Sequence, residues 1–487
     1  MEVGLSLIVG LILGLLVVFT PSLPLPADYQ KLVYVIPFAI TVVILFNNLD
    51  RLILAVMAIS VPLNLDVSVI VSPYARNIEN VSKGYRTLIA PTELRISLVT
   101  VVLAVGFMLW LLRTSGGERK PIRFFPATTI PALGFIGLSA LSIVQAQDQQ
   151  LWFFRIAELV ELFLVYFYLA NHIRTNADMQ FFVLVSLGGM LVEEGLMIVQ
   201  WVTGLSFTIA GIQASLISGD RVAGTFGFTG PAAGYLTSLG LIAFALLWGF
   251  TKKSNQRLAI ASFGFGIVAL VSTGSRIGWI SFAVTLLALI LFGRWQGWIK
   301  TKTLALLALG GLALGIAFFG IISTRFIAYD YGSAASRPMM WKLAWRVIQA
   351  HPWLGVGAGN YALITRNYYT PDIGLANEVL DIQLHNAYLN VWAESGIFAL
   401  LCYLGVLGVS ILKAWSCRGS PSQFVSKMGI GLGLAILSLC IQMATDTFHM
   451  SSINLFVWLM VALAASLPYL EHENDADISA TPKNMES

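Results

Sequence analysis

Fourteen apolar runs, each long enough to cross a bilayer, constrain this sequence more than any other feature. A spanning helix needs about 20 apolar residues to cross about 30 Å of hydrocarbon. The runs begin near Leu5, Lys31, Leu52, Ile96, Thr129, Trp152, Gln180, Pro231, Leu258, Ile277, Thr303, Ala387, Met428 and Ser452. Pro62 and Asp66 interrupt the third run, so a count of twelve, with early segments re-entrant or interfacial, stays open. We expect an all-α, polytopic integral membrane protein with about 12–14 transmembrane helices.

The composition supports this class. Hydrophobic residues make up 57% of the 487 residues, charged residues 11%, and the mean hydropathy is +0.79. Soluble domains have about 25% charged residues, so a soluble fold is excluded. The three cysteines fall in predicted spans and a cytoplasmic loop, which does not suggest an exported disulfide framework. The sequence has no cluster of basic and aromatic residues of the kind that binds nucleic acid, so no nucleic-acid partner is expected. The apolar runs indicate the lipid bilayer as the partner.

The distribution of Lys and Arg predicts the orientation. Alternate loops contain 15 basic residues, whereas the short loops opposite contain only Lys31, Arg221 and Arg276. Cytoplasmic loops carry the excess, so both termini are expected in the cytoplasm. We therefore expect one transmembrane domain over residues 1–470, with a large outward-facing loop at 324–386, and a disordered cytoplasmic tail at 471–487.

Several charged residues lie inside predicted spans, where they are costly. Arg155 has Glu158 three residues later, which favours an internal ion pair. Alternatively, its planar fork of donors points into a cavity and holds a phosphate. Glu193 and Glu194 lie near the middle of a span and face different sides of the helix, so one can pair with an arginine and the other can be protonated. We assign neither a catalytic role.

Two arginines occupy the outward turns. Arg221 precedes a glycine-rich segment, where backbone can approach a ligand closely, although an ordinary turn with a solvated arginine explains it equally well. Arg276 follows the tight turn at Gly274 and begins a helix, and free amide groups at a helix start favour an anion.

The long loop contains an amphipathic helix that Ser336 can cap and that we expect to lie in the outer interface. Its predicted apolar face is Met340, Trp341, Ala344, Trp345 and Ile348, and its polar residues include Arg337 and Arg346. The helix ends before His351 and Pro352. The glycines of GVGAGN do not belong to a strand and helix unit, so a packing turn explains them better than a nucleotide site.

His385 opens the twelfth run at the outer surface. A neutral imidazole can accept a hydroxyl proton near neutral pH, although a histidine at a helix start is commonly structural. Asn386 can orient the ring or an acceptor sugar. Glu394, nine residues later, is too distant to pair with His385.

Four segments resemble the O-antigen ligase and O-antigen polymerase superfamily. They are RVAGTFGF, STGSRIGWISF, RPMMWKLAWRVIQAHPWLGVGAGNY and LHNAYLNVWAESGIFALL. The ligase pattern H[NSQ]x9G is met by His385, Asn386 and Gly396, and RxxxL by Arg155 and Leu159. The pattern continues GxxG, GxxT or GxxY, where this chain has Ala399, so ligase and polymerase both remain open.

The resemblance implies a GT-C-like membrane glycosyltransferase in the bacterial inner membrane, with its active face in the periplasm. Its donor would be a glycan on undecaprenyl pyrophosphate and its acceptor a lipid or glycan hydroxyl. Arg155, Arg221 and Arg276 would clamp the pyrophosphate, with Arg337 and Arg346 as further candidates, and His385 would act as general base with inversion. The outward loops contain no paired-aspartate motif, so neither a metal nor another cofactor is expected.

A transporter or transport accessory is the rival hypothesis, since proteins resembling this family have been linked to bicarbonate uptake. The intramembrane Glu193 and Glu194 could then serve an ion path. Against this, the charged positions gather at the outer face, whereas transporter sites lie near the midplane between repeated, broken helices.

Overall fold

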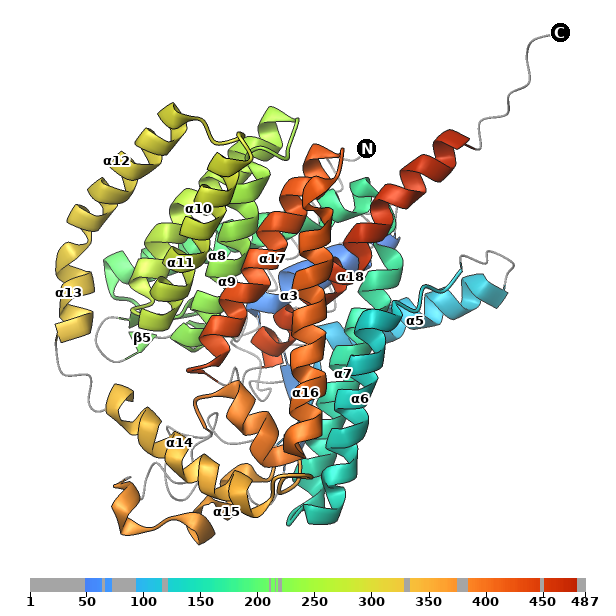
Figure 1. The fold of residues 1–487 in the computed structure, drawn as a ribbon, viewed down its shortest axis with the longest axis vertical. Coiled ribbons are helices and arrows are strands. Elements are labelled where there is room, and N and C mark those ends of the chain that lie inside the picture. Colours follow the sequence, from blue (N-terminus) through green and yellow to red (C-terminus); the bar gives the residue numbers. More distant parts are fainter. Residues whose placement is uncertain are drawn as a thin grey trace, which may run out of the picture.

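The computed structural model describes residues 49–63, 66–71, 93–115, 121–209, 212–214, 216–217, 221–327, 333–374, 384–446 and 451–479. In these ranges the chain is a bundle of antiparallel helices with a smaller helical unit at one end (Figure 1). Nine of the described helices are long and apolar enough to cross a membrane, or ten if a bent pair forms one span. The predicted all-α, polytopic fold is thus confirmed.

Most of the long helices lie side by side, and α5 projects from one side of the bundle (Figure 1). The bundle helices are α3 (Leu49–Leu63), α5 (Leu98–Ser115), α6 (Pro126–Leu141), α7 (Gln149–His172), α8 (Asn176–Thr203), α9 (Thr229–Leu246), α10 (Lys253–Ser272), α11 (Arg276–Trp295), α12 (Thr301–Ala317), α16 (Ala387–Ser416), α17 (Gln423–Met443) and α18 (Ser451–Ser479). Outside the bundle lie α13 (Phe319–Ile327), α14 (Ser333–Ala350) and α15 (Tyr361–Tyr368). Three antiparallel strand pairs complete the described structure: β1 (Asp66–Val71) with β2 (Glu93–Ser97), β3 (Phe207–Ile209) with β4 (Ile212–Ala214), and β5 (Leu216–Ile217) with β6 (Arg221–Val222).

Every predicted run from Leu52 onward corresponds to one bundle helix, and the runs at Leu5 and Lys31 lie outside the described residues. The third run forms α3, which is only 15 residues long and contains Pro62 in its last turn. At the carboxyl end, α18 continues through Ser479, into the segment predicted as a tail.

The centre of the bundle is formed by α9 and α17, which are buried along nearly their whole length. Small residues allow this, because a glycine lets neighbouring backbones approach closely. A side chain at Gly278 of α11 would lie 2.7 Å from Cβ of Ala233, and one at Gly431 of α17 would lie 2.8 Å from Cβ of Ala245. Both alanines belong to α9, so glycines on two neighbouring helices fix its position.

The pair α12 and α13 stands at the edge of the bundle (Figure 1). Neither helix has a buried residue among those described, and the chain bends by 62° between them. This bend carries the chain from the bundle to the unit of α14 and α15.

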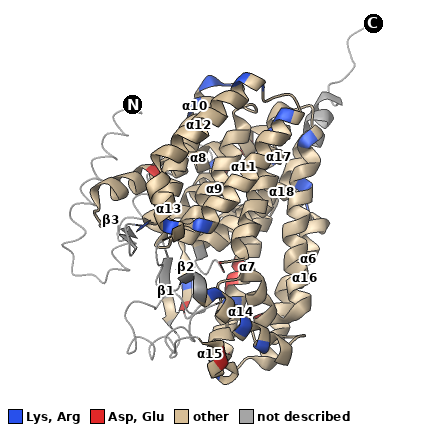
Figure 2. Ribbon diagram, turned by 60° about the vertical axis from the view of Figure 1, so that its left-hand side comes forward, with Lys and Arg blue, Asp and Glu red and all other residues tan. Residues whose placement is uncertain are grey.

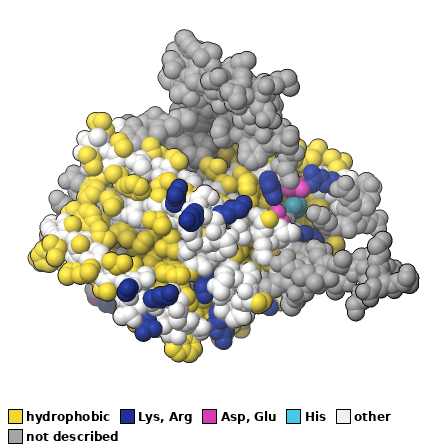
Figure 3. All heavy atoms as spheres, turned by 90° about the horizontal axis from the view of Figure 1, so that it is seen from above, with side chains coloured by type: hydrophobic (Ala, Val, Ile, Leu, Met, Phe, Trp, Pro, Cys, Tyr) yellow, Lys and Arg dark blue, Asp and Glu magenta, His cyan; other side chains and the backbone are white. Residues whose placement is uncertain are grey.

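Basic side chains mark one end of the bundle. Lys and Arg residues at the ends of α10, α12 and α17 lie at the top in Figure 2, and the same face is seen from above in Figure 3. The unit of α14 and α15 lies at the opposite end. The basic ends of these three helices therefore lie together at the end of the bundle away from α14 and α15.

The unit at that end has its own small core. Helix α14 begins at Ser333, three residues before the predicted cap, and ends at Ala350. Its buried residues are Met340, Leu343, Ala344, Val347 and Ile348. Trp345 is 46% exposed, and its ring packs edge-on against Trp392 of α16 with 5.6 Å between the ring centroids.

Candidate functional site

The turn between α10 and α11 is the centre of the candidate site. Gly274 has φ +60°, a left-handed conformation that favours glycine, and it reverses the chain within a few residues. Ser275 caps α11 by accepting a hydrogen bond from the Gly278 amide at 3.3 Å. Arg276 is therefore the first residue of α11, as predicted.

Two arginines from other elements are bonded to this turn. Arg221 of β6 donates from Nε to the Thr273 carbonyl at 3.1 Å, and from its guanidinium to the Thr229 hydroxyl at the start of α9. Arg325 of α13 donates from Nε to the Gly274 carbonyl at 3.2 Å. The peripheral α13 is thus connected to the turn through a side chain that the sequence analysis did not single out.

Four cationic side chains converge here. Burial and the positive charges of Arg325, Arg276 and Arg337 together lower the pKa of Arg221 to about 10. The four arginines come from β6, α11, α13 and α14, so the site exists only in the folded chain. Like charges held together in a half-buried place favour binding of an anion, which relieves their repulsion.

His385 lies beside this cluster, immediately before α16. The Trp341 indole of α14 donates to the His385 carbonyl at 3.2 Å. Burial lowers the pKa of the His385 imidazole, the Arg337 charge adds to this, and the Asp446 carboxylate opposes it. Arg337 influences both His385 and Arg221, so it connects the histidine to the arginine cluster.

Asn386 is the N-cap of α16. Its side-chain oxygen accepts from the Leu389 amide at 3.0 Å, and its Nδ2 donates to the Ala444 carbonyl at 2.9 Å. The side chain therefore fixes the start of α16 against the connection that follows α17. Its predicted contact with an acceptor sugar stays a prediction.

Arg155 belongs to a separate network inside the bundle. It forms an ion pair with Glu158 at 2.7 Å, and the other oxygen of Glu158 accepts from Asn454 of α18 at 3.2 Å. Glu394 of α16 also acts on Arg155 and accepts from the backbone amides of Gly359 and Tyr361. The ion pair considered from the sequence is present, and the phosphate role of Arg155 stays a prediction.

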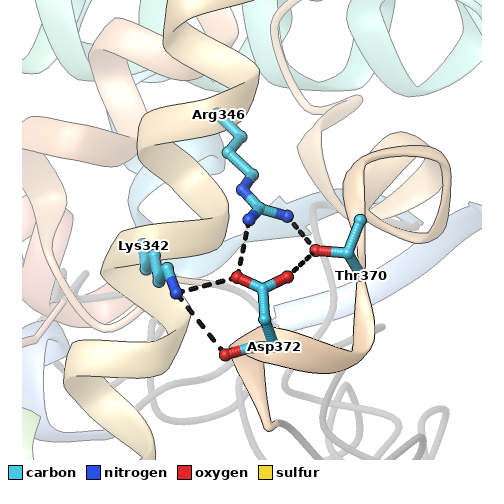
Figure 4. A network of polar contacts seen from close by, with 4 residues as sticks. All are labelled: Lys342, Arg346, Thr370 and Asp372. Carbon is cyan, nitrogen blue, oxygen red and sulfur yellow. Dashed lines mark hydrogen bonds and ion pairs between the residues drawn. The ribbon is translucent and has the colours of Figure 1, made fainter.

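Arg346 is engaged at the outer side of α14. Figure 4 shows its guanidinium on Asp372 at 2.8 Å, with Thr370 and Lys342 bonded to the same carboxylate. Arg337 lies nine residues earlier on this helix, a rise of about 14 Å. Arg346 is thus removed from the cluster along α14, and its predicted role in substrate binding is untested.

The glycine-rich loop after α14 enters a break in α16. Gly396 has φ +84° and interrupts the helix, leaving carbonyls above it without helical partners. The amides of Val356 and Gly357 bond to the Ala393 and Glu394 carbonyls at 2.9 and 3.0 Å. A side chain at Gly396 would lie 1.9 Å from the Trp353 carbonyl. The prediction that these glycines form a packing turn is confirmed.

The two carboxylates of α8 have different surroundings. Glu193 accepts from the Thr225 amide at 2.7 Å and from its hydroxyl at 2.8 Å, so it holds the RVAGTFGF segment against α8. Glu194 is fully buried beside Gly266 of α10, and no hydrogen-bond partner for it lies within the described segments. Glu193 is therefore bound to the loop rather than to an arginine.

Over the residues that the structure describes, no three His, Cys, Asp or Glu side chains converge to form a metal site. The predicted absence of a metal stays a prediction. Sequence reasoning missed Arg325 and Asp446. Arg325 stands at the start of the long outward loop, on the side where the short loops have few basic residues, and that charge pattern could have indicated it.

These features define an all-α, multi-pass membrane protein with a cationic site and a histidine at one end of the bundle. Residues 261–404 match the O-Antigen ligase family. A curated O-antigen ligase from Pseudomonas aeruginosa is 28% identical over 201 residues, which is 41% of this chain and 41% of the relative. The chain is therefore similar to O-antigen ligases over its central and carboxyl-terminal helices, and it spans less than half the length of the curated relative. The family match contains Arg276, Arg325, Arg337 and His385, whereas Arg221 and Asp446 lie outside it.

Proposed function

We propose that this protein is a membrane glycosyltransferase of the ligase or polymerase type. It transfers a glycan from undecaprenyl pyrophosphate to a hydroxyl of a lipid or glycan acceptor. The observation that supports this most is the convergence of Arg221, Arg276, Arg325 and Arg337 beside His385. A cationic cluster next to a neutral base matches the needs of a reaction in which a pyrophosphate leaves.

In the proposed reaction the acceptor oxygen attacks the anomeric carbon of the donor glycan. His385 accepts the hydroxyl proton as the new carbon–oxygen bond forms. The bond to undecaprenyl pyrophosphate breaks on the opposite face of the sugar, so the anomeric configuration inverts. The arginines stabilise the negative charge that develops on the departing pyrophosphate, and guanidinium forks bind its oxygens in pairs.

The low pKa of His385 suits this role. A base must be neutral before it reacts, and burial with the Arg337 charge lowers the pKa of His385 against the effect of Asp446, which favours the neutral imidazole. The same arginine that disfavours the imidazolium can hold the donor.

The location of the site supports a reaction on the outer side of the membrane. It lies at the end of the bundle opposite the Lys-rich and Arg-rich loops. Because such loops face the cytoplasm, the site would face the periplasm, where a flipped lipid-linked glycan is available.

Replacing His385 tests the proposal. With purified protein in liposomes, a lipid-linked oligosaccharide and an acceptor, His385→Ala should lower glycan transfer by about 10²–10⁴-fold. His351→Ala is the matched control, because His351 lies in the same extramembrane unit and bonds to Tyr368 at 2.7 Å, away from the cluster. Full transfer by His385→Ala would refute the proposal.

Glycan profiles of cells lacking the gene separate the remaining possibilities. Loss of polymer attachment indicates a ligase, and shortened chains indicate a polymerase. An unaltered profile together with reduced bicarbonate uptake would favour the transport hypothesis. A metal chelator added to the liposome assay should not change transfer, because arginines supply the positive charge.

A further inference from the structure

Asp446 lies in the connection from α17 to α18 and is fixed to the segment that carries His385. The Ala387 amide donates to the Asp446 carbonyl at 3.1 Å, and Asn386 Nδ2 donates to the Ala444 carbonyl at 2.9 Å. Residues 444–446 are thus bonded at two points to the residues that directly follow the histidine. The backbone places Asp446 next to His385, although 61 positions separate them in the sequence.

The carboxylate of Asp446 is held against the start of α9. A side chain at Gly230 would lie 2.1 Å from Asp446 Oδ2 and 3.3 Å from its Cγ, so the carboxylate lies close against the backbone of Gly230. Gly230 is the second residue of α9, where the helix dipole favours a negative charge. The preceding residue, Thr229, is bonded to Arg221. The start of α9 therefore connects the arginine cluster with the carboxylate.

We propose that Asp446 is a positioning residue for His385, whose carboxylate orients the imidazole and stabilises its protonated form after it accepts the acceptor proton. This inference rests on the proposed role of His385 as the base. A carboxylate that holds one side of an imidazole leaves its other nitrogen directed at the substrate. Asp446 itself does not take the proton.

The electrostatics at His385 agree with this arrangement. Two charged groups of opposite sign face the ring: Asp446 from the α17 to α18 connection and Arg337 from α14. The carboxylate raises the pKa of His385, whereas the arginine and burial lower it. Removing the Asp446 charge should therefore lower the pKa of His385. Removing the Arg337 charge should raise it.

The first measurement does not depend on catalysis. Diethylpyrocarbonate modifies neutral imidazole, and mass spectrometry can follow its rate at His385 against pH in the purified full-length protein. Asp446→Asn should shift this titration to lower pH, because the favourable charge is lost. Arg337→Gln should shift it to higher pH. Asp372→Asn, which changes an exposed carboxylate on the far side of α14, should leave it unchanged.

The second measurement is the pH profile of glycan transfer. In Asp446→Asn the acid limb should move to lower pH, and kcat on the plateau should fall by about tenfold to a hundredfold, less than loss of the base itself. The KM for the donor should stay within about twofold, because the arginines are unchanged. Asp446→Glu should recover part of kcat because it restores the charge.

The outcomes separate the two hypotheses. An unchanged titration of His385 in Asp446→Asn overturns the positioning role even if His385→Ala is inactive. Full activity of His385→Ala overturns the proposed function instead. If Asp446→Asn does not fold, Asp446→Ser removes the same charge without adding volume, and the same shift is expected. A merely structural role predicts lower stability with no shift in either profile.

Discussion

Arg276 shows how one residue can combine a structural and a chemical position. It starts α11 directly after the cap at Ser275, so the turn fixes its backbone. The neighbouring carbonyls of Thr273 and Gly274 are occupied by Arg221 and Arg325. The carbonyl groups of this turn therefore hold two arginine side chains in place. An anion site of this kind depends on side-chain cations, whereas other anion sites consist of helix amides alone.

Changing Arg276 tests whether the planar fork matters as well as the charge. Arg276→Gln should lower kcat for glycan transfer by about 10²–10³-fold, as expected for loss of one electrostatic contact in a transition state. Arg276→Lys should remain impaired, because a point charge cannot bind two oxygens in parallel. Wild-type transfer rates in the Arg276→Lys variant would show that bidentate binding by the guanidinium is not needed.

Arg325 gives a parallel test at a position that sequence patterns did not single out. Arg325→Gln should weaken donor binding or lower kcat, because it removes a charge from the cluster and a bond to the Gly274 carbonyl. Lys302→Gln, an exposed residue at the opposite end of α12, is the control and should behave as wild type. Equal activity of both variants would show that α13 takes no part in the site.

At the scale of elements, the break in α16 joins the unit of α14 and α15 to the bundle. Amides of the loop after α14 replace the helical partners that Gly396 removes. Backbone amides of the same loop also donate to the Glu394 carboxylate, which lies two residues before Gly396. The Arg155 network and the helix break are therefore adjacent. A discontinuous membrane helix is tolerated here because protein backbone satisfies its carbonyl groups.

Gly396→Ala should therefore destabilise the protein. The new methyl group would meet the Trp353 carbonyl, and the positive φ alone costs about 1–3 kcal/mol for a residue other than glycine. Thermal unfolding in detergent should show a lower midpoint. Gly408→Ala in the same helix has nothing within 4 Å and should be neutral or slightly stabilising. Similar midpoints for both variants would contradict the description of the break.

At the scale of the whole molecule, the two ends of the bundle differ in charge and construction. One end has short loops rich in Lys and Arg, and the other has the arginine site and the unit of α14 and α15. By the positive-inside rule, this asymmetry predicts that the end rich in Lys and Arg faces the cytoplasm.

Thiol labelling can check the orientation. In a background without Cys402, Cys417 and Cys440, which form no disulfide, Asn367→Cys on α15 should react with a membrane-impermeant maleimide in intact spheroplasts. Ser254→Cys at the start of α10 should react only after lysis. The reverse pattern would place the site in the cytoplasm and contradict the proposed periplasmic reaction.

The spans, the start of α11 at Arg276 and the packing role of the GVGAGN glycines could be predicted from the sequence, because hydrophobic length and turn chemistry are local properties. His385 was recognised from its place at the start of a helix, and Arg221 and Arg276 from their place in outward turns. That these three side chains lie close together could not be predicted, because it depends on how distant segments pack.

The sequence by itself determined that this chain spans a membrane many times and which end of each helix is basic, since transfer of apolar side chains out of water depends on composition over about 20 residues. Tertiary structure alone decided that Glu158 also binds Asn454, that Arg346 binds Asp372, and that Arg325 and Asp446 join the site. These outcomes depend on which side chains the packing of α9, α13, α14 and α17 brings within bonding distance, and no periodicity along the chain encodes that distance.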